Sequence, residues 1–284
     1  MFADLHLHTH FSDGTYSPEK VVASGREHGL SILALTDHDT LEGCARAAAA
    51  CAAAGMEFIT GAELTAEQGG HEVHLLAYFV VPDHPRLRRE MAKFQAVRQD
   101  RIREMVVRLN RINIPLEAEA VFALANCNAP GRPHVARALV AAGQCRTLDE
   151  AFERFLKKHR PAWVPKYRMS AAHAIELVHE AGGLAVMAHP GLNRTDEVIP
   201  PMAAAGLDGL ECFHSRHSTF QMEQYLALAE QLDLLVTGGS DCHGESKGRP
   251  LIGSIKLPSD YVTRMKQRLA ARAHPAPAVH AAAA

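Results

Sequence analysis

Short apolar runs alternate with longer amphipathic stretches along most of this chain. Seven of these runs have the length and composition of buried strands, at residues 2–8, 31–36, 57–63, 72–80, 184–189, 208–213 and 234–239. The segments between them carry helix signals. This alternation is typical of βα units around a parallel sheet, so the sequence predicts an α/β fold, a (β/α)7 barrel.

Helix boundaries are marked by capping residues and glycines. Ser17 precedes Pro18, the pairing expected at an N-cap and a first helical turn, and Gly29 is a stop signal. The same reasoning predicts further helices that Thr40 and Ser170 cap and that end near Gly55 and Gly182.

The alternation is interrupted once, between the fourth and fifth strands. A helix is predicted from about residue 85 to 113, and Thr147 with Glu150 fits a capping box at the start of another. The apolar stripe of the long helix is Met91, Phe94, Ile102, Met105, Leu109 and Ile112. A structureless connection of this length would be unusual. We therefore expect residues 84–165 to form an inserted α-helical subdomain over a barrel made of residues 1–83 and 166–269, with a disordered tail at 270–284.

Imidazole and carboxylate side chains recur beside the apolar runs. They are His6, His8, His38, Glu63, His74, His189, Asp241 and His243, with Asp13 in a turn after the first run. A single histidine at a strand end is more often an ordinary polar residue. Repetition in successive units instead favours one shared centre, since these are transition-metal ligands and a parallel barrel gathers its strand ends at one face. His71 is the alternative to His74, which we prefer because it begins the apolar run.

Composition excludes several classes of protein. The formal net charge of −2 argues against an extended nucleic-acid coat, and no apolar window is long enough to span a membrane. No secretory signal is visible at the N-terminus. The six cysteines form no C-x-x-C pair, which predicts buried or free thiols in the cytoplasm. Strand alternation should turn Cys242 away from the neighbouring candidate ligands.

The polar motifs resemble those of the PHP family, whose name refers to polymerase-associated and histidinol-phosphatase members. The matching segments are Asp4-Leu5-His6-Leu7-His8-Thr9, Ser12-Asp13-Gly14, Thr36-Asp37-His38-Asp39, Gly61-Ala62-Glu63, Ala188-His189-Pro190 and Ser240-Asp241-Cys242-His243. The resemblance implies a distorted (β/α)7 barrel with two or three divalent metal ions. It assigns His6, His8, Glu63 and Asp241 to one metal, His74 and His189 with a bridging Glu63 to a second, and Asp13, His38 and His243 to a third.

Asp13 departs from the family pattern, in which histidine is frequent at this position. A harder oxygen ligand weakens the preference for Zn²⁺ and favours Mn²⁺ or Mg²⁺. We expect Mn²⁺, and Zn²⁺, Fe²⁺ and Mg²⁺ are the alternatives. In such a centre the metals activate water and offset the charge of a phosphoryl group. Glu63 and Asp241 would then be catalytic, and His214, after the sixth strand, is a candidate proton donor. The alternative role for His214 is a hydrogen-bonding wall residue.

The predicted insertion narrows the substrate class. Its segment Gly131-Arg132-Pro133-His134 resembles the branch acting on nucleoside 3′,5′-bisphosphates and short 5′-phosphorylated oligonucleotides. Candidate phosphate-binding residues are Arg132, His134, Arg98, Arg101 and Lys166. The sequence leaves two alternatives open. One is a histidinol-phosphatase-like phosphomonoesterase, and the other is a non-catalytic metal-binding module, although no ligand is visibly missing.

Overall fold

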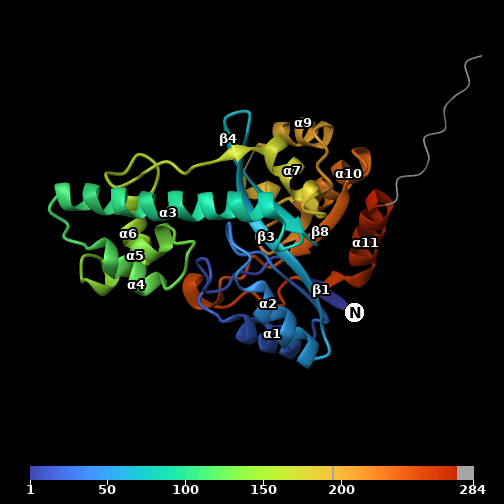
Figure 1. The fold of residues 1–284 in the computed structure, drawn as a ribbon, viewed down its shortest axis with the longest axis horizontal. Helices are drawn as coiled ribbons and strands as arrows, with labels where there is room; N and C mark the ends of the chain where they lie inside the picture. The colour runs from blue at the N-terminus through green and yellow to red at the C-terminus, as the bar shows by residue number, and fades with distance from the viewer. Residues whose placement is uncertain (194, 274–284) are drawn as a thin grey trace, which may run out of the picture.

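The computed structural model describes residues 1–193 and 195–273, and its strands form one mixed sheet that nearly closes into a barrel (Figure 1). The strands are β1 (Phe2–Asp4), β2 (Ile32–Leu35), β3 (Glu57–Gln68), β4 (His71–Tyr78), β5 (Met169–Ser170), β6 (Leu184–Met187), β7 (Gly209–His214), β8 (Leu235–Gly239) and β9 (Leu257–Pro258). Their order is β8-β7-β6-β4-β3-β2-β1-β9, with β5 beside β3. The chain after β1 reaches β8, where the Leu5 N–H donates to the Gly238 carbonyl over 3.1 Å. The predicted distorted α/β barrel is therefore confirmed.

Helices surround the sheet and fill the predicted insertion. They are α1 (Pro18–Glu27), α2 (Cys44–Ala53), α3 (Pro85–Arg111), α4 (Ala118–Ala125), α5 (Arg132–Ala141), α6 (Leu148–Ala151), α7 (Ala171–Glu180), α8 (Pro190–Asn193), α9 (Ile199–Ala204), α10 (Thr219–Gln231) and α11 (Ser259–Ala273). Short π and 3-10 turns are η1 (Phe152–Leu156), η2 (Asp196–Val198) and η3 (Gly244–Lys247). None of the described helices is both long and apolar enough to cross a membrane.

Three of the four predicted N-caps are confirmed and one is wrong. The Ser17 and Ser170 hydroxyls accept N–H groups of the first turns of α1 and α7. Thr40 does not cap α2, because its hydroxyl accepts the N–H of Glu42 in a separate turn and the helix begins only at Cys44. Thr147 caps α6 as predicted, but the Glu150 carboxylate accepts the N–H of Arg146 rather than that of Thr147.

The expectation of an all-parallel sheet is wrong at β4. This strand runs antiparallel to both β3 and β6, because a hairpin rather than a helix follows β3. Gly69 and Gly70 form the turn with φ of 58° and 81°, a backbone region that glycine tolerates. The reversal places the start of β4, with His74, at the same end of the barrel as the carboxyl ends of the parallel strands.

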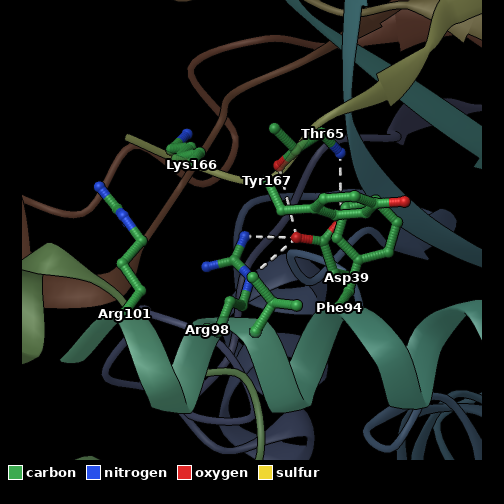
Figure 2. A pocket seen from close by; sticks show the side chains of 8 residues that line it. Asp39, Thr65, Phe94, Arg98, Arg101, Lys166 and Tyr167 are labelled. Carbon is green, nitrogen blue, oxygen red and sulfur yellow. Dashed lines mark hydrogen bonds and ion pairs between the residues drawn. The ribbon is translucent and has the colours of Figure 1, made fainter. Parts of the chain in front are cut away.

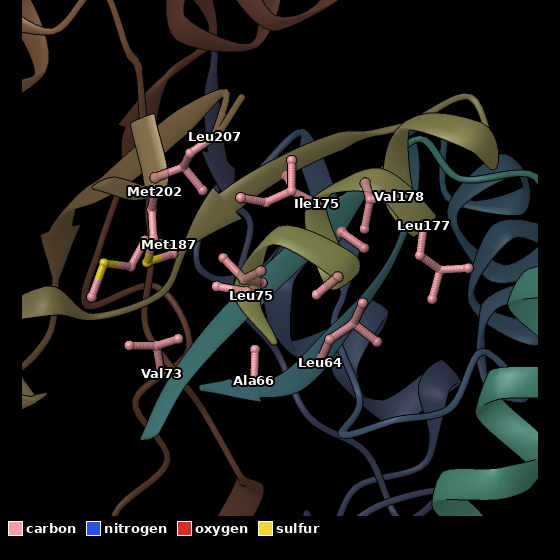
Figure 3. Close-up of a cluster of buried hydrophobic side chains, with 14 of the residues drawn as sticks. Leu64, Ala66, Val73, Leu75, Ile175, Leu177, Val178, Met187, Met202 and Leu207 are labelled. Atoms are coloured by element: carbon pink, nitrogen blue, oxygen red, sulfur yellow. The ribbon is translucent and has the colours of Figure 1, made fainter. Parts of the chain in front are cut away.

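The main apolar core lies between the sheet and the helices on one side of it (Figure 3). Leu64 of β3 and Leu75 of β4 are register partners and are completely or almost completely buried. They share the core with Ile175 and Val178 of α7 and with Met187 of β6. Burial of such aliphatic side chains stabilises a fold by roughly 1.5–3 kcal/mol each, so this layer fixes β3 and β4 firmly.

The helical segment has a second apolar core of its own, to which α3 contributes Ile102, Met105 and Leu109. The first half of α3 belongs to the main core, through Leu87, Met91 and Phe94. One continuous helix therefore joins the two cores, and the division of the chain at 84 and 165 stays a prediction. Ile112, predicted for the same apolar stripe, is 40% exposed because the helix ends at Arg111.

The C-terminal boundary differs from the expected start of the tail at 270. Helix α11 continues to Ala273, because Leu269 packs against the barrel core and Arg272 pairs with the buried Asp208. His274 and His280, which we expected to be irrelevant to the site, lie outside the described residues.

Candidate metal centre and phosphate site

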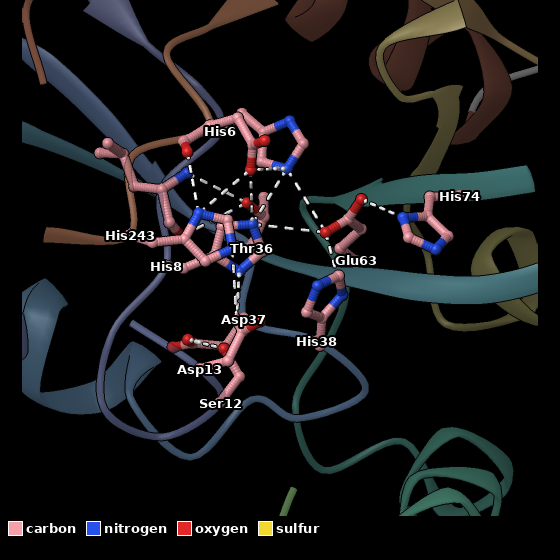
Figure 4. A network of polar contacts seen from close by, with 12 residues as sticks. His6, His8, Ser12, Asp13, Thr36, Asp37, His38, Glu63, His74 and His243 are labelled. Carbon is pink, nitrogen blue, oxygen red and sulfur yellow. Dashed lines mark hydrogen bonds and ion pairs between the residues drawn. The ribbon is translucent and has the colours of Figure 1, made fainter. Parts of the chain in front are cut away.

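His6 and His8 meet at the centre of the barrel mouth. Their Nε2 atoms are 3.1 Å apart, and both side chains are completely buried (Figure 4). Nδ1 of His6 lies 3.0 Å from a Glu211 oxygen, so Nδ1 donates to that carboxylate and Nε2 is the ring nitrogen that faces the cluster. Both Nε2 atoms also approach Oδ1 of Asp241, at 3.6 Å from His6 and 3.2 Å from His8. This arrangement brings lone pairs and a carboxylate together around one point.

Glu63 of β3 presents its two oxygens to two different groups of imidazoles (Figure 4). Oε1 lies 2.7 Å from Nδ1 of His74 and 3.0 Å from Nε2 of His189. Oε2 lies 3.3 Å from Nε2 of His8 and 3.0 Å from Nδ1 of His38. A carboxylate with this division of contacts is suited to bridging two cations.

Asp13 and His243 extend the cluster on the side away from His74. Nε2 of His243 is 3.3 Å from Oδ1 of Asp13, and its Nδ1 is 3.4 Å from Oδ1 of Asp241. The His243 ring stacks on that of His8 with a centroid separation of 4.1 Å. The structure thus brings together all nine side chains that the sequence proposed as ligands. By contrast His71 is half exposed and 4.0 Å from Glu197.

The donor set fits divalent metals. Within the described ranges, several buried polar atoms of the cluster make no hydrogen bond of suitable geometry, although some of them lie close to another atom of the cluster. These atoms are Nδ1 of His8, His38 and His189, Oδ1 of Asp13 and Nε2 of His214. Metal–ligand bonds of about 2.0–2.2 Å place neighbouring ligand atoms about 3–3.5 Å apart. The separations between Glu63 Oε2 and the imidazoles of His8 and His38 fall in that range.

The electrostatics of the cluster keep the carboxylates ionised. Burial alone would raise the pKa of Glu63, but His38, His74 and His6 hold it well below its ordinary value. Asp241 shows the same opposition between burial and the neighbouring imidazoles, and its pKa is also lowered. Burial together with His243 lowers the pKa of His8 to about 3, so His8 is neutral, as a ligand must be.

Two further carboxylates anchor the loops that carry the cluster. Asp37 accepts the Thr9 N–H at 2.7 Å and the Ser12 hydroxyl at 2.6 Å, which fixes the loop between His8 and Asp13. Asp4 accepts the Ser240 N–H at 2.8 Å, next to Asp241. Burial raises the pKa of Asp4 to about 6. Both residues belong to the sequence motifs, but their positions as loop anchors are visible only in the fold.

Left-handed backbone geometry recurs around the cluster. Asp39, His189 and Asp241 have φ of 53°, 30° and 53°. Non-glycine residues in this region store strain and are found preferentially at functional sites. At His189 and Asp241 the bend turns the side chain at the end of a strand toward the barrel axis.

Sequence reasoning missed Glu211. It lies within β7, is fully buried and accepts hydrogen bonds from Nδ1 of His6 and from the N–H of His189 at 2.8 Å. The signal in the sequence was an ionisable residue between the apolar residues Leu210 and Cys212 in the middle of a predicted strand.

His214, the candidate proton donor, is buried beside the cluster. Its Nδ1 accepts the N–H of Arg216, so the proton of the neutral ring is on Nε2. Nε2 is 3.7 Å from Oδ2 of Asp241 and has no hydrogen-bond partner. The side chain is therefore oriented to donate toward the cluster.

Arg98 of α3, which the sequence suggested as a phosphate-binding residue, forms an ion pair with Asp39 of the barrel. Its Nε donates to Oδ2 of Asp39 over 2.8 Å, and Asp39 also accepts the Thr65 N–H (Figure 2). The small cavity beside this pair has room for about one water molecule, at ≈ 10 Å³. Arg98 therefore joins α3 to the barrel.

Arg101, Arg132 and Lys166 line a larger cavity of about 340 Å³, called here the basic cavity. It also includes Lys158, Arg168, Trp163 and Glu72. Lys166 connects it to the metal cluster, since its Nζ is 3.5 Å from Nε2 of His74. Burial, with repulsion from Arg132 and Arg98, lowers the pKa of Arg101 to about 9, and burial also lowers the pKa of Arg132 and of Lys166.

His134 occupies the first turn of α5. Its Nδ1 accepts the Gly131 N–H at 3.0 Å, and the side chain is buried. Burial lowers its pKa to about 4. Because Nδ1 caps the helix, only Nε2 remains to contact a ligand, and His134 is absent from the metal-binding groups found among the described residues.

Comparisons with known proteins agree with this geometry. The sequence profile of the PHP domain matches residues 4–160. The chain is 33% identical over 258 residues to the 3′,5′-nucleoside bisphosphate phosphatase of Chromobacterium violaceum, covering 88% of this chain and 90% of that protein. It is 31% identical over 247 residues to the 5′-3′ exoribonuclease Rnm of Escherichia coli, with 84% of each chain covered. A crystal structure from Bifidobacterium adolescentis, assigned to the metal-dependent phosphoesterases, superposes with a TM-score of 0.86 at 37% identity, over 94% of this chain and 96% of that one. The chain belongs to the PHP domain family.

Proposed function

We propose that this protein is a metal-dependent phosphoesterase that removes the 3′-phosphate from nucleoside 3′,5′-bisphosphates and also acts on short 5′-phosphorylated oligonucleotides. The observation that carries the proposal is the basic cavity directly beside the metal cluster, with Lys166 Nζ 3.5 Å from His74 Nε2. A substrate with two phosphates can use both sites at once. The similarity to the phosphatase of Chromobacterium violaceum supports the same substrate class.

The metal assignment is the one that the family resemblance implies, and the short contacts of the cluster support it. His6, His8 and Asp241 would hold one ion together with Glu63, and His74 and His189 would hold a second, also with Glu63. Asp13, His38 and His243 would hold a third. Divalent ions here, for which we favour Mn²⁺, would supply an activated water and offset the charge of the phosphoryl oxygens. The mixed oxygen and nitrogen donors support Mn²⁺ over a softer metal.

The residues around the cluster have separate roles. Arg101, Arg132 and Lys166 bind the non-reacting 5′-phosphate, which places the 3′-phosphate at the cluster. Glu63 and Asp241 stay ionised and hold their positions through buried contacts. His214 has its Nε2 proton directed toward the cluster, where it can protonate the departing 3′-oxygen.

The test is phosphate release from a panel of bisphosphates, mononucleotides and small phosphomonoesters, before and after chelation and with Mn²⁺ restored. We expect the highest kcat/KM for a nucleoside 3′,5′-bisphosphate. A clear preference for histidinol phosphate would overturn the substrate assignment. Purified protein with no bound metal and no activity after Mn²⁺ addition would instead support a non-catalytic module.

A further inference from the structure

A second cavity, of about 580 Å³, adjoins the metal cluster at Asp13 and His243. We call it the Phe152 cavity, after the aromatic residue of η1 that lines it together with Arg137 and Ser246. It is distinct from the basic cavity, because the two share no lining residue among those described. Its volume lies within the range of about 300–1,000 Å³ that is usual for small-molecule sites.

The start of α5 separates the two cavities. Arg132 lines the basic cavity, and the next residue, Pro133, lines the Phe152 cavity. The Arg132 guanidinium also lies over the Phe152 ring, 5.9 Å from its centroid. The two cavities therefore contact the cluster at different points, the basic cavity near His74 and the Phe152 cavity at His243.

The two cavities differ in charge. The basic cavity has five Arg and Lys side chains and the single carboxylate of Glu72. The Phe152 cavity has one arginine, Arg137, against Asp13 and Asp149. Arg137 already donates to the Asp13 carbonyl over 2.7 Å. The Phe152 cavity therefore disfavours a phosphate, while its aromatic ring suits an uncharged base and sugar.

We propose that the Phe152 cavity binds the nucleoside on the 3′ side of the scissile phosphate, and that Asp149 disfavours any further phosphate beyond it. This inference rests on the proposed function. The order of basic cavity, metal cluster and Phe152 cavity then matches the order of 5′-phosphate, scissile phosphate and second nucleoside in a 5′-phosphorylated dinucleotide.

The bond changes are the same for both substrates. The oxygen of a water molecule bonds to phosphorus, the bond from phosphorus to the 3′-oxygen breaks, and a proton passes to that oxygen. With a bisphosphate the phosphorus leaves as inorganic phosphate. With a dinucleotide it keeps its bond to the second nucleoside, so the products are two 5′-mononucleotides. Only the dinucleotide has a second nucleoside, so only the dinucleotide needs the Phe152 cavity.

The experiment compares kcat/KM of the metal-loaded enzyme for a nucleoside 3′,5′-bisphosphate, a 5′-phosphorylated dinucleotide and the same dinucleotide with a 3′-phosphate. Ser246→Trp places an indole at the cavity wall, and Ser254→Trp is the matched control at an exposed serine of the same C-terminal region. We expect Ser246→Trp to lower the dinucleotide-to-bisphosphate ratio about tenfold, as loss of a base-stacking site does, and the control to leave it unchanged.

The second variant is Asp149→Lys, at an exposed position in the first turn of α6. It should raise the ratio of 3′-phosphorylated to unphosphorylated dinucleotide by roughly two- to fivefold, as reversal of a surface charge does. It keeps the proposal testable if Ser246→Trp does not fold.

The outcomes separate the two proposals. A wild-type enzyme that cleaves bisphosphate but no dinucleotide overturns the Phe152 cavity as a nucleoside site. It also removes oligonucleotides from the proposed function, but leaves the bisphosphate phosphatase activity intact. Equal losses for both substrates in Ser246→Trp would assign the cavity to the first nucleoside and also overturn the inference. No cleavage of either substrate by the metal-loaded wild type defeats the proposed function itself.

Discussion

Both oxygens of the Glu211 carboxylate lie within hydrogen-bond distance of Nδ1 of His6, at 3.0 and 3.1 Å, and neither side chain is exposed. Such a contact fixes the tautomer and the orientation of a ligating imidazole. We predict that Glu211→Gln lowers metal affinity by about 10- to 100-fold, because the amide is a weaker acceptor for the ring N–H. Competition with a chromogenic chelator measures the affinity without any assay of activity.

The matched control for this variant is Glu197→Gln, whose side chain is 69% exposed. It should bind metal as the wild type does. Equal metal affinity in Glu211→Gln and the control would show that Glu211 does not position His6 for a metal.

Asp241 and Cys242 are neighbours with opposite surroundings. Asp241 faces the imidazoles of the cluster, whereas Cys242 is buried in an apolar core. We predict that Asp241→Asn lowers kcat by roughly two or more orders of magnitude, since an amide is a poor metal ligand, while Cys242→Ala has little effect. Steady-state kinetics of the two variants make the comparison. Comparable activity in both variants would mean that Asp241 is not a metal ligand and that the ligand assignment at this strand end is wrong.

Arg132 tests the basic cavity independently of the metals. If it binds the 5′-phosphate, Arg132→Ala should cost about 2–4 kcal/mol in kcat/KM for a bisphosphate and much less for a monophosphate without that group. Bound metal, measured by elemental analysis, should be unchanged. Arg160→Ala, at a side chain 51% exposed, is the control. Equal losses on both substrates would assign Arg132 to the reacting phosphate or to the fold.

Asp208 stabilises the fold away from the site. Its carboxylate is buried and accepts hydrogen bonds from the Ala185 N–H and from the Arg272 guanidinium. It also lies 2.8 Å from Nε2 of His179. Burial opposes the ionised form, but His179 and Arg272 lower the pKa of Asp208. Its contribution is therefore complete above the unfolded pKa of about 4 and is lost as the pH falls through the folded value. We expect Asp208→Asn to lower the free energy of unfolding by about 1–3 kcal/mol at pH 7. This is less than for a fully buried ion pair, because solvent screens the partly exposed Arg272.

Thermal unfolding of metal-free protein at pH 7 and near pH 3 checks this prediction. The difference in Tm between wild type and Asp208→Asn should shrink at the lower pH. A difference that stays constant would mean that the variant acts through packing rather than charge.

Periodicity and motif spacing were sufficient to predict the barrel and to identify the side chains that meet at its mouth. They were not sufficient for β4, because a Gly69-Gly70 turn is compatible with either a loop or a hairpin. His74 nevertheless reaches the cluster, since reversal of the strand moves its first residues to the mouth. We chose His74 over His71 because His74 begins an apolar run. The physical reason that His74 lies at the cluster is instead the antiparallel direction of β4.

Contacts between residues that are distant in the sequence could not be predicted either. In the sequence, Asp39 appeared only as part of a motif, and Arg98 only as a candidate phosphate-binding residue. Their ion pair depends on how α3 crosses the barrel, which no local pattern specifies. Glu211 escaped notice for a similar reason, because its partner His6 is far away in the sequence.

Helix α3 is continuous from the main core at Leu87 to the second core at Leu109, and the Arg98–Asp39 pair holds its middle against the barrel. A lid that swings needs a joint with few buried contacts. The stretch of α3 between Leu87 and Leu109 with the fewest buried side chains is residues 95–100, and there the Arg98–Asp39 pair ties the helix to the barrel. The helical segment therefore behaves as a fixed wall of the site. We therefore expect substrates to enter and leave through the cavities on either side of α5, without an opening motion of the segment as a whole.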